Sequence, residues 1–416
     1  MIVMKSRTIR NCQTQKGGAL IIMALILLLT GTAVMFSVLD ASGVKIERDK
    51  KTAAALSEAK VALIAWSVNS ATPGQLPCPE NTLSIGTISE GTANTTCTLP
   101  AIGRLPWKSL GIGDLRDGSN EELWYAISAG FRTSPINSDT PAQLTVDGVA
   151  GDAVAIIFSP GAVIGGQNRP PPTSVAPPNV VQYLEGSNND GDNTFVTIGA
   201  AGSFNDRLLS ITHDELFAVV EKRVVAEVSN ALLDYFCGVG NANYATKVCI
   251  ASGGNRFFPR PSAFSDTTCF GAGTLATSDC LPNAISNHGR LTANPIPAWT
   301  ATSILRRIST SNWFQENGWR ELIHYSVAPA CTNGTLNCNG TGFLTLNQAL
   351  ITPIDNKNIV VTATGGVVAG QVRTNNAEKS LEINYLEDEN LTTLNDIYTR
   401  IAPAGIVFND HSVSIP

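Results

Sequence analysis

The chain has 416 residues, 43% of them hydrophobic and only 15% charged, with a formal net charge of −6 at pH 7. This length and hydrophobic share suffice for one or two folded cores, and length alone favours two domains. The sparse, slightly acidic charge excludes the basic surface that nucleic-acid-binding proteins use, so we expect no nucleic-acid partner.

The first predicted element is an apolar helix near the N-terminus. From Gly18 to Leu39 there is no charged residue, and most positions are Ala, Leu, Ile, Met, Val or Phe. As a helix, this run is long enough to cross a hydrocarbon core about 30 Å thick. The basic leader before it, residues 1–17, is expected to stay in the cytoplasm. The sequence therefore predicts a membrane-spanning helix over 18–43.

The junction between leader and helix resembles the class III signal of type IV pilins and pseudopilins. Lys16, Gly17 and Gly18 stand directly before the apolar run. In that family a prepilin peptidase cuts after the glycine and leaves the helix in place. The resemblance implies cleavage between Gly17 and Gly18 and N-terminal methylation of Gly18. An uncleaved signal anchor is the alternative, because the apolar helix alone does not distinguish the two.

One position departs from the usual pilin pattern. Most pilins have Glu at mature position five, where this chain has Ile22. The subgroups without that Glu are the PilX-type minor pilins and the K-type tip pseudopilin of type II secretion. The resemblance therefore implies a minor or tip subunit of a type IV pilus or of a type II secretion pseudopilus.

The resemblance also implies partners and a location. The partners would be other pilins or pseudopilins, met through the N-terminal helix, and also the prepilin peptidase, the inner-membrane assembly platform and the lipid bilayer. The protein would lie in a bacterial inner membrane with a single pass, a cytoplasmic N-terminus and periplasmic heads. Assembly would then carry it to a filament at the cell surface.

A second apolar pattern follows the first without a proline before Pro73. Ala53, Leu56, Ala59 and Leu63 recur at three- and four-residue steps, which is typical of an amphipathic helix. We expect one long helix whose second half packs on a globular head.

The cysteines indicate an oxidising compartment. Leaving out Cys12 of the leader, eight remain, and they form four couples of neighbours in the sequence. They have no zinc-type spacing, so disulfides are the better interpretation. Pairing by proximity is one of 105 connectivities. It gives the pairs Cys78–Cys97, Cys237–Cys249, Cys269–Cys280 and Cys331–Cys338.

An internal repeat organises the rest of the chain. The pattern Gly-x4-Gly-Gln-x-Arg at 161–169 recurs at 365–373. Tyr-Leu-Glu at 183–185 and Phe-Asn-Asp at 204–206 recur, in the same order, about 200 residues later. A helix predicted over 212–236, which Thr212 or Asp214 would cap, matches the helix over 53–66.

The repeat predicts two copies of one unit. We expect a leader at 1–17, the transmembrane segment at 18–43, a first pilin-like unit at 44–211 and a second at 212–416. Short β-branched runs at 153–158, 358–364 and 380–385 predict strands. The expected fold class is α+β, with the long N-terminal membrane-spanning helix continuing into tandem heads. Each head would be a helix packed on an antiparallel sheet.

One loop carries a candidate metal site. Asn188, Asp190 and Asp192 alternate around Gly191, and oxygen ligands at such spacing can wrap calcium. An Asn/Asp/Gly turn without an ion explains the same residues, and Gly199 leaves the loop without the closing acid of an EF-hand. Apart from this possible calcium, no cofactor is expected.

Two classes of function remain open. No nucleophile elbow, phosphate loop or metalloprotease motif occurs, and the four histidines are isolated in the sequence, so we do not expect an enzyme. The first class is a processed filament subunit. The second is an uncleaved, membrane-anchored extracytoplasmic binding or adhesion protein. Removal of the leader distinguishes them.

Overall fold

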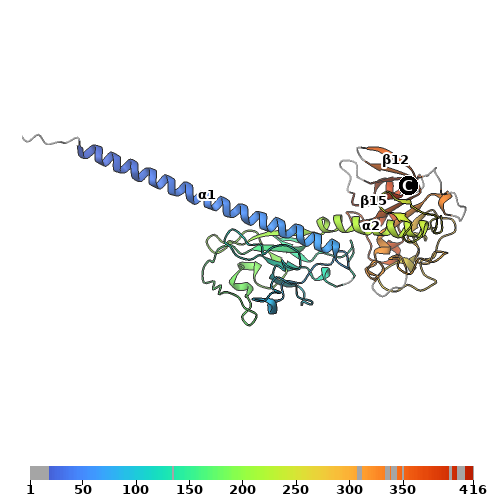
Figure 1. Cartoon of the computed structure of the whole chain (residues 1–416), viewed down its shortest axis with the longest axis horizontal. Helices are drawn as coiled ribbons and strands as arrows, with labels where there is room; N and C mark the ends of the chain where they lie inside the picture. Colours follow the sequence, from blue (N-terminus) through green and yellow to red (C-terminus); the bar gives the residue numbers. More distant parts are fainter. Residues whose placement is uncertain are drawn as a thin grey trace, which may run out of the picture.

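The computed structural model describes residues 18–133, 135–306, 312–332, 338, 344–348, 351–392, 396–400 and 408–415, with side chains from Gly43 onward except at 348 and 351–355. Helix α1 (Gly18–Asn69) extends away from two folded units, and its C-terminal part lies on the first of them (Figure 1). Helix α2 (His213–Cys237) runs from the first unit into the second.

The first unit is built on one six-stranded sheet. Its four central strands are antiparallel, in the order β1 (Ala101–Arg104), β2 (Trp124–Ile127), β4 (Val149–Ser159) and β6 (Arg207–Thr212). Two shorter strands extend from β4, namely β3 (Leu144–Val146) and β5 (Thr194–Phe195).

The second unit repeats this strand order. Its main sheet runs β9 (His288–Arg290), β10 (Ile323–Val327), β13 (Ile359–Ala363) and β15 (His411–Ile415), again antiparallel. A separate sheet joins β11 (Leu344–Gln348) to β12 (Ile351–Lys357) and β14 (Ile397–Thr399). The hairpin of β7 (Ala242–Asn243) and β8 (Val248–Cys249) follows α2. The internal repeat in the sequence thus corresponds to two copies of one sheet.

The sheet of the first unit is buried on both faces. Successive side chains of each strand point to opposite faces, so each strand contributes to two cores. Tyr125 and Ile157 join a core with Leu63 of α1. Trp124 and Phe158 belong to a second core on the other face. The first core continues along α2 into the second unit, so the two units share their apolar interior.

The expected fold class is wrong in its account of the heads. The described residues contain 15 strands but only four α-helices. Two of these helices, α3 (Trp313–Glu316) and α4 (Asn376–Lys379), have four residues each. The sheets are also not purely antiparallel, since β3 pairs with β5 in parallel and β11 with β14 in parallel. Strands of two or three residues are too short to leave a period-two pattern, so the sequence did not reveal them.

The expected membrane span is not supported either. Across the residues that the structure describes, no helix combines the length and the apolar character needed to cross a membrane. This finding overturns the transmembrane segment at 18–43, and with it the single-pass inner-membrane location and the periplasmic placement of the heads. The part of α1 whose side chains the structure describes begins only at Gly43 and carries Lys45, Glu47 and Arg48, so it contains no apolar run of the length a membrane requires.

One local prediction is also wrong. The run at 380–385 forms a 3₁₀ turn over Glu382–Asn384 instead of a strand. Before β2, the chain turns at Asp117. There the Asp117 carboxylate accepts the N–H groups of Ser119 and Glu121, at 2.7 and 3.0 Å.

Candidate functional site

Helix α1 has two parts, which differ in what surrounds their side chains. From Gly43 to Lys51 every side chain except that of Asp49 is exposed, including Val44 and Ile46 at 53% and 63%. From Thr52 onward, one face is buried on the first unit. The part from Gly43 to Lys51 is therefore accessible to another molecule.

Buried apolar side chains hold the second part of α1 on the sheet. Leu56, Ala59 and Leu63 are at most 6% exposed and recur with helical period, as the sequence predicted. The N–H of Gly118 donates to the Thr52 hydroxyl at 2.9 Å, and a Cβ on this glycine would collide with the backbone of Arg48. The first unit therefore approaches the helix backbone closely where the exposed part ends.

Ion pairs fix the direction of α1. Asp49 pairs with Arg207 of β6 at 2.7 Å. Lys60 pairs with Glu215 of α2 at 2.6 Å and donates to the Ser210 carbonyl at 2.9 Å. These contacts join α1 to the strand and the helix that lead into the second unit.

The proposed processing site lies at the start of α1. Gly17 and the rest of the leader lie outside the described residues, and Gly18 is the first residue of α1. Cleavage after Gly17 and methylation of Gly18 stay predictions.

The cysteine pairs in the structure are the pairs expected from proximity. All four couples lie at disulfide-bonding distance, with Cα–Cα separations of 5.8, 5.3, 4.7 and 4.6 Å in chain order. Four disulfides fit an oxidising compartment. Cys237–Cys249 links the C-terminus of α2 to β8, and the other three close loops around the sheets.

The structure separates the three residues of the candidate calcium loop. The buried Asn188 amide donates to the Asp206 carboxylate at 3.0 Å, and its oxygen accepts the Val196 N–H at 2.9 Å. Asp190 and Asp192 are exposed, and each accepts a backbone N–H two residues later. Among the described residues no three His, Cys, Asp or Glu side chains form a metal-binding group.

Asn188 has a counterpart in the second unit, which explains its role. Asn390 donates to Asp410 at 2.8 Å and accepts the Thr399 N–H at 2.7 Å. The same contacts occur where the surrounding loop has a different sequence. Asn188 is therefore a structural residue that joins the loop to the start of β6.

Each unit also contains an arginine that organises the repeated glycine motif. Arg169 donates to the carbonyls of Gly161 and Gln182, both at 2.8 Å, and its guanidinium lies 5.0 Å from the centre of the Tyr183 ring. Arg373 repeats these contacts in the second unit, with partners at the equivalent positions: Gly365, Asn384 and Tyr385.

A carboxylate next to each arginine holds the chain before the last strand of the sheet. Glu185 accepts the Gln167 amide at 2.6 Å and the N–H groups of Asn205 and Asp206 at 3.0 and 3.1 Å. Glu387 does the same in the second unit. Its partners there are Gln371, Asn409 and Asp410. Burial raises the pKa of Asp206 to about 8 and that of Asp410 well above its usual range. The sequence showed these residues as a repeat but not their contacts.

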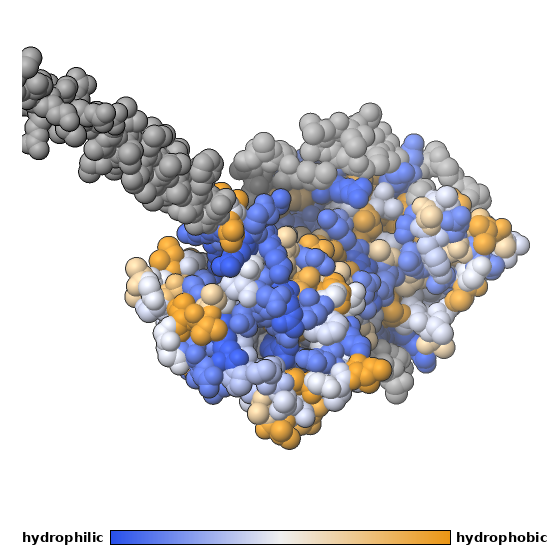
Figure 2. All heavy atoms as spheres, turned by 60° about the vertical axis from the view of Figure 1, so that its left-hand side comes forward, coloured by the Kyte–Doolittle hydropathy of each residue, from blue (hydrophilic) through white to orange (hydrophobic). Residues whose placement is uncertain are grey.

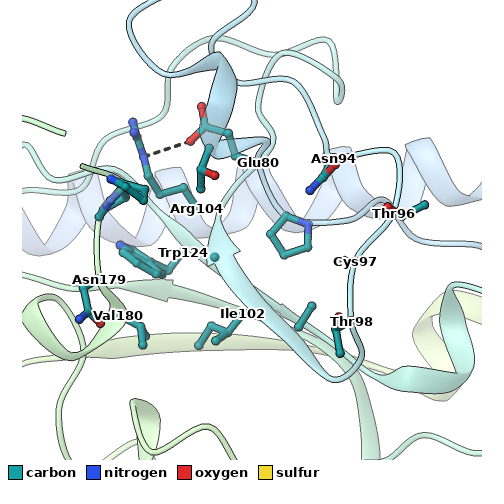
Figure 3. Close-up of a pocket in the computed structure, with 16 residues that line it drawn as sticks. Glu80, Asn94, Thr96, Cys97, Thr98, Ile102, Arg104, Trp124, Asn179 and Val180 are labelled. Carbon is teal, nitrogen blue, oxygen red and sulfur yellow. Dashed lines mark ion pairs between the residues drawn. The ribbon is translucent and has the colours of Figure 1, made fainter. Parts of the chain in front are cut away.

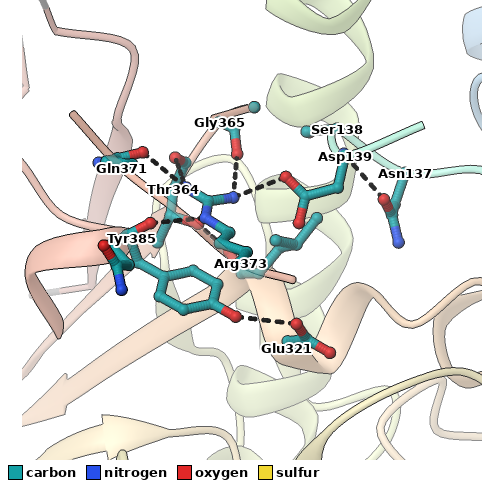
Figure 4. Close-up of polar contacts among 12 residues, drawn as sticks. Asn137, Ser138, Asp139, Glu321, Thr364, Gly365, Gln371, Arg373 and Tyr385 are labelled. Carbon is teal, nitrogen blue, oxygen red and sulfur yellow. Dashed lines mark hydrogen bonds and ion pairs between the residues drawn. The ribbon is translucent and has the colours of Figure 1, made fainter. Parts of the chain in front are cut away.

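The two arginines differ in the carboxylate with which they pair. Arg169 pairs with Glu121 of its own unit at 3.3 Å. Arg373 pairs at 2.8 Å with Asp139, which belongs to the first unit (Figure 4). Burial raises the pKa of Asp139, and the neighbouring Arg373 opposes that shift. A repeated structural arginine thus also links the two units.

Further polar contacts surround this link. Asn317 of the second unit accepts the Ile136 N–H at 2.7 Å, and its carbonyl accepts the Asn137 amide at 2.6 Å. The Ser138 hydroxyl donates to Glu221 of α2 at 2.6 Å. The loop at 136–140 therefore fixes the position of the second unit on the first.

Figure 2 shows a face on which hydrophilic residues predominate and hydrophobic ones form small separate groups. Comparison with known proteins adds no relative, because no family model, curated protein or solved structure matches the chain.

Proposed function

We propose that the chain is a pilin-like subunit in a minor or tip position of a filament, either a type IV pilus or a type II secretion pseudopilus. The observation that carries the proposal is the form of α1. Among the residues whose side chains the structure describes, α1 is exposed from Gly43 to Lys51 and its buried face begins at Thr52, so this part of the helix is left for contacts with other molecules.

Two further features support this proposal. The apolar run that follows Gly18 in the sequence gives that part of the helix the composition of a packing surface between neighbouring subunits. The two units are joined by a shared core and by the Asp139–Arg373 pair, so each subunit presents a double head. A double head is bulky for a shaft subunit that repeats every few ångströms, so it favours a minor or tip position. Ile22, which stands where most pilins have Glu, favours the same position.

The proposed partners follow from this role. A prepilin peptidase would cut between Gly17 and Gly18, and other pilins or pseudopilins would pack along α1 during assembly on the platform. No catalytic role is proposed for the chain.

The mass of the N-terminal peptide tests the proposal. The full chain is produced in cells with and without a prepilin peptidase. We expect a start at Gly18, with or without one added methyl group, only where the peptidase is present. An intact Met1 start in both strains would refute the proposal.

A second experiment tests assembly separately from cleavage. Ile22→Glu restores the residue that most pilins have, and Ile22→Leu is the matched control. We expect Ile22→Glu, but not Ile22→Leu, to change the amount of this subunit in sheared filaments, because the proposed minor or tip position depends on the absence of Glu at residue 22. Equal incorporation of both variants would argue against that place.

A further inference from the structure

In the first unit a buried carboxylate lies beside a cation. Glu80 borders a cavity of about 880 Å³ next to β1, and its carboxylate lies 3.3 Å from the Arg104 guanidinium (Figure 3). A buried charge is tolerated when a partner of opposite charge offsets its loss of water. The junction between the two units, at loop 136–140, has a different balance of charge.

Four carboxyl groups and one guanidinium meet at this junction. The carboxyl groups belong to Asp139, Glu221, Glu387 and Asp410, and the guanidinium to Arg373. Glu221, Glu387 and Asp410 are at most 8% exposed. Arg373 attracts all four carboxyl groups, but within the described residues its ion pair is with Asp139. One positive charge cannot offset four negative ones in a protein interior, so some of these carboxyl groups carry protons.

The other charged neighbours of these groups do not correct the excess of acid. Asp214, at the start of α2, raises the pKa of Glu221 further. Glu321 and Lys379 act on the pKa of Asp139 in opposite senses. The junction therefore keeps more buried carboxyl groups than cations.

Hydrogen bonds show where one of the protons lies. One oxygen of Asp410 accepts the Glu387 N–H at 3.2 Å and the Asn390 amide at 2.8 Å. Its other oxygen is buried and receives no donor from the described residues. A protonated carboxyl fits this arrangement, because its O–H is itself a donor. Asp410 is therefore neutral in the folded chain, and the charge lies on Glu387, which accepts the Gln371 amide and the N–H groups of Asn409 and Asp410.

Glu221 is the second protonated group, and it lies where the two units meet. Its carboxyl accepts the Ser138 hydroxyl at 2.6 Å, and burial raises its pKa to about 8. The loop that carries Ser138 packs closely on the second unit, since a Cβ on Gly366 would lie 2.7 Å from the Ser138 carbonyl oxygen. An ionised Glu221 would therefore be confined near the charge of Glu387 without a cation of its own.

A second cavity brings water to the edge of this junction. It has a volume of about 470 Å³ and lies between residues 138–142 of the first unit and residues 366–369 of the second. His213 and Asp214 also line it, with 3.3 Å between the imidazole and the carboxylate. Glu221 is not part of this lining, so its carboxyl gains water only when the loop moves.

We propose that the junction is a pH-sensitive switch, in which the proton on Glu221 keeps loop 136–140 seated on α2 and on the second unit, and loss of that proton detaches the loop. The ionised carboxyl then gains water, which the seated loop denies it. The two units are held in one arrangement at low pH and gain freedom to change their relative orientation as the pH rises. This switch does not depend on the filament role of α1.

Amide hydrogen exchange of the full chain, followed by mass spectrometry of peptides that span 135–142, tests the proposal. In the seated loop the Ile136 N–H donates to the Asn317 side chain at 2.7 Å, so its exchange reports on opening. Each rate is divided by the intrinsic rate of an unstructured peptide at the same pH. Opening returns Glu221 to water, where its pKa is near 4.5, and so releases a proton. We expect the normalised rate to rise about tenfold per pH unit from about pH 5 and to level off above pH 8.

Two variants of α2 assign the pH dependence. Glu221→Gln is expected to make the normalised exchange of the loop independent of pH. Glu227→Gln is the matched control, because this carboxylate is partly exposed and pairs with Arg223 at 2.6 Å, and it should keep the pH dependence of the wild type. Peptides from β4 should stay protected throughout, which separates opening of the loop from unfolding of the first unit.

The wild type alone can refute the proposal, even if Glu221→Gln fails to fold. A normalised rate for the loop that does not change between pH 5 and pH 8 would overturn it. So would a loss of protection that occurs in the loop and in β4 together, or a pH dependence that Glu221→Gln retains in full.

Discussion

Glu221 offers the sharpest test of the link between the two units. It lies on α2, it is 5% exposed, and its carboxylate accepts the Ser138 hydroxyl. Burial raises the pKa of Glu221 from 4.5 to about 8. We predict that Glu221→Gln removes a pH dependence of stability and leaves the fold intact, since the amide has the same shape and no charge.

The sign and the size of the expected difference in the free energy of unfolding follow from proton linkage. The folded pKa lies above the unfolded one, so the bound proton stabilises the fold fully below about pH 4.5, and this stabilisation is lost as the pH rises through 8. Three to four pKa units correspond to about 4–5 kcal/mol at most. The free energy of unfolding of the variant should therefore match that of the wild type near pH 5 and exceed it by several kcal/mol near pH 9.

Urea unfolding of both proteins across this pH range measures the difference. Glu215→Gln, on the same helix, is the control, because the pKa of Glu215 is shifted in the opposite direction to that of Glu221. Its carboxylate is half-exposed, and its pKa is lowered by the Lys60 ammonium and by the N–H and hydroxyl of Thr212, which outweigh its partial burial. This variant should lose stability near neutral pH but not in acid. Parallel pH curves for Glu221→Gln and the wild type would refute the assigned environment of Glu221.

Three further changes should behave as follows. Arg373→Met removes the buried guanidinium from Asp139 and also from the carbonyls of Gly365 and Asn384, so it should lower the free energy of unfolding by about 3 kcal/mol, more than Asp139→Asn does; equal losses in urea unfolding would contradict this. Leu63→Ala should cost about 3 kcal/mol because the Leu63 side chain is fully buried between α1 and the sheet, and the exposed Val61→Ala should cost far less; similar melting temperatures would count against the packing of α1. Thr212→Ala removes the capping box of α2 and should cost about 1 kcal/mol, whereas Thr212→Ser should keep most of it; circular dichroism melts would show no difference if the cap were unimportant.

The sequence predicted those parts of the fold that depend on neighbouring residues. The start of α2 could be placed because Thr212 and Glu215 form a local capping motif. The disulfides could be paired because each couple closes a short loop. The glycine motif around Arg169 could be recognised as a repeated unit because its residues are close in the sequence and contact one another.

Contacts between distant residues could not be read in this way. Asp139 and Arg373 are 234 positions apart, and no periodic pattern connects them. Asn188 was assigned to a calcium loop because its neighbours are acidic, whereas its partner Asp206 lies 18 residues further on.

The duplicated arginine and carboxylate contacts also have a consequence for tracing ancestry. The same side chains hold the same turns in two copies whose surrounding loops have diverged, so these positions tolerate change least. They form a spaced signature: Gly-x4-Gly-Gln-x-Arg, then Tyr-Leu-Glu, then Phe-Asn-Asp, which enters the last strand of the sheet. A chain with a single copy of this signature would represent the form that existed before the duplication.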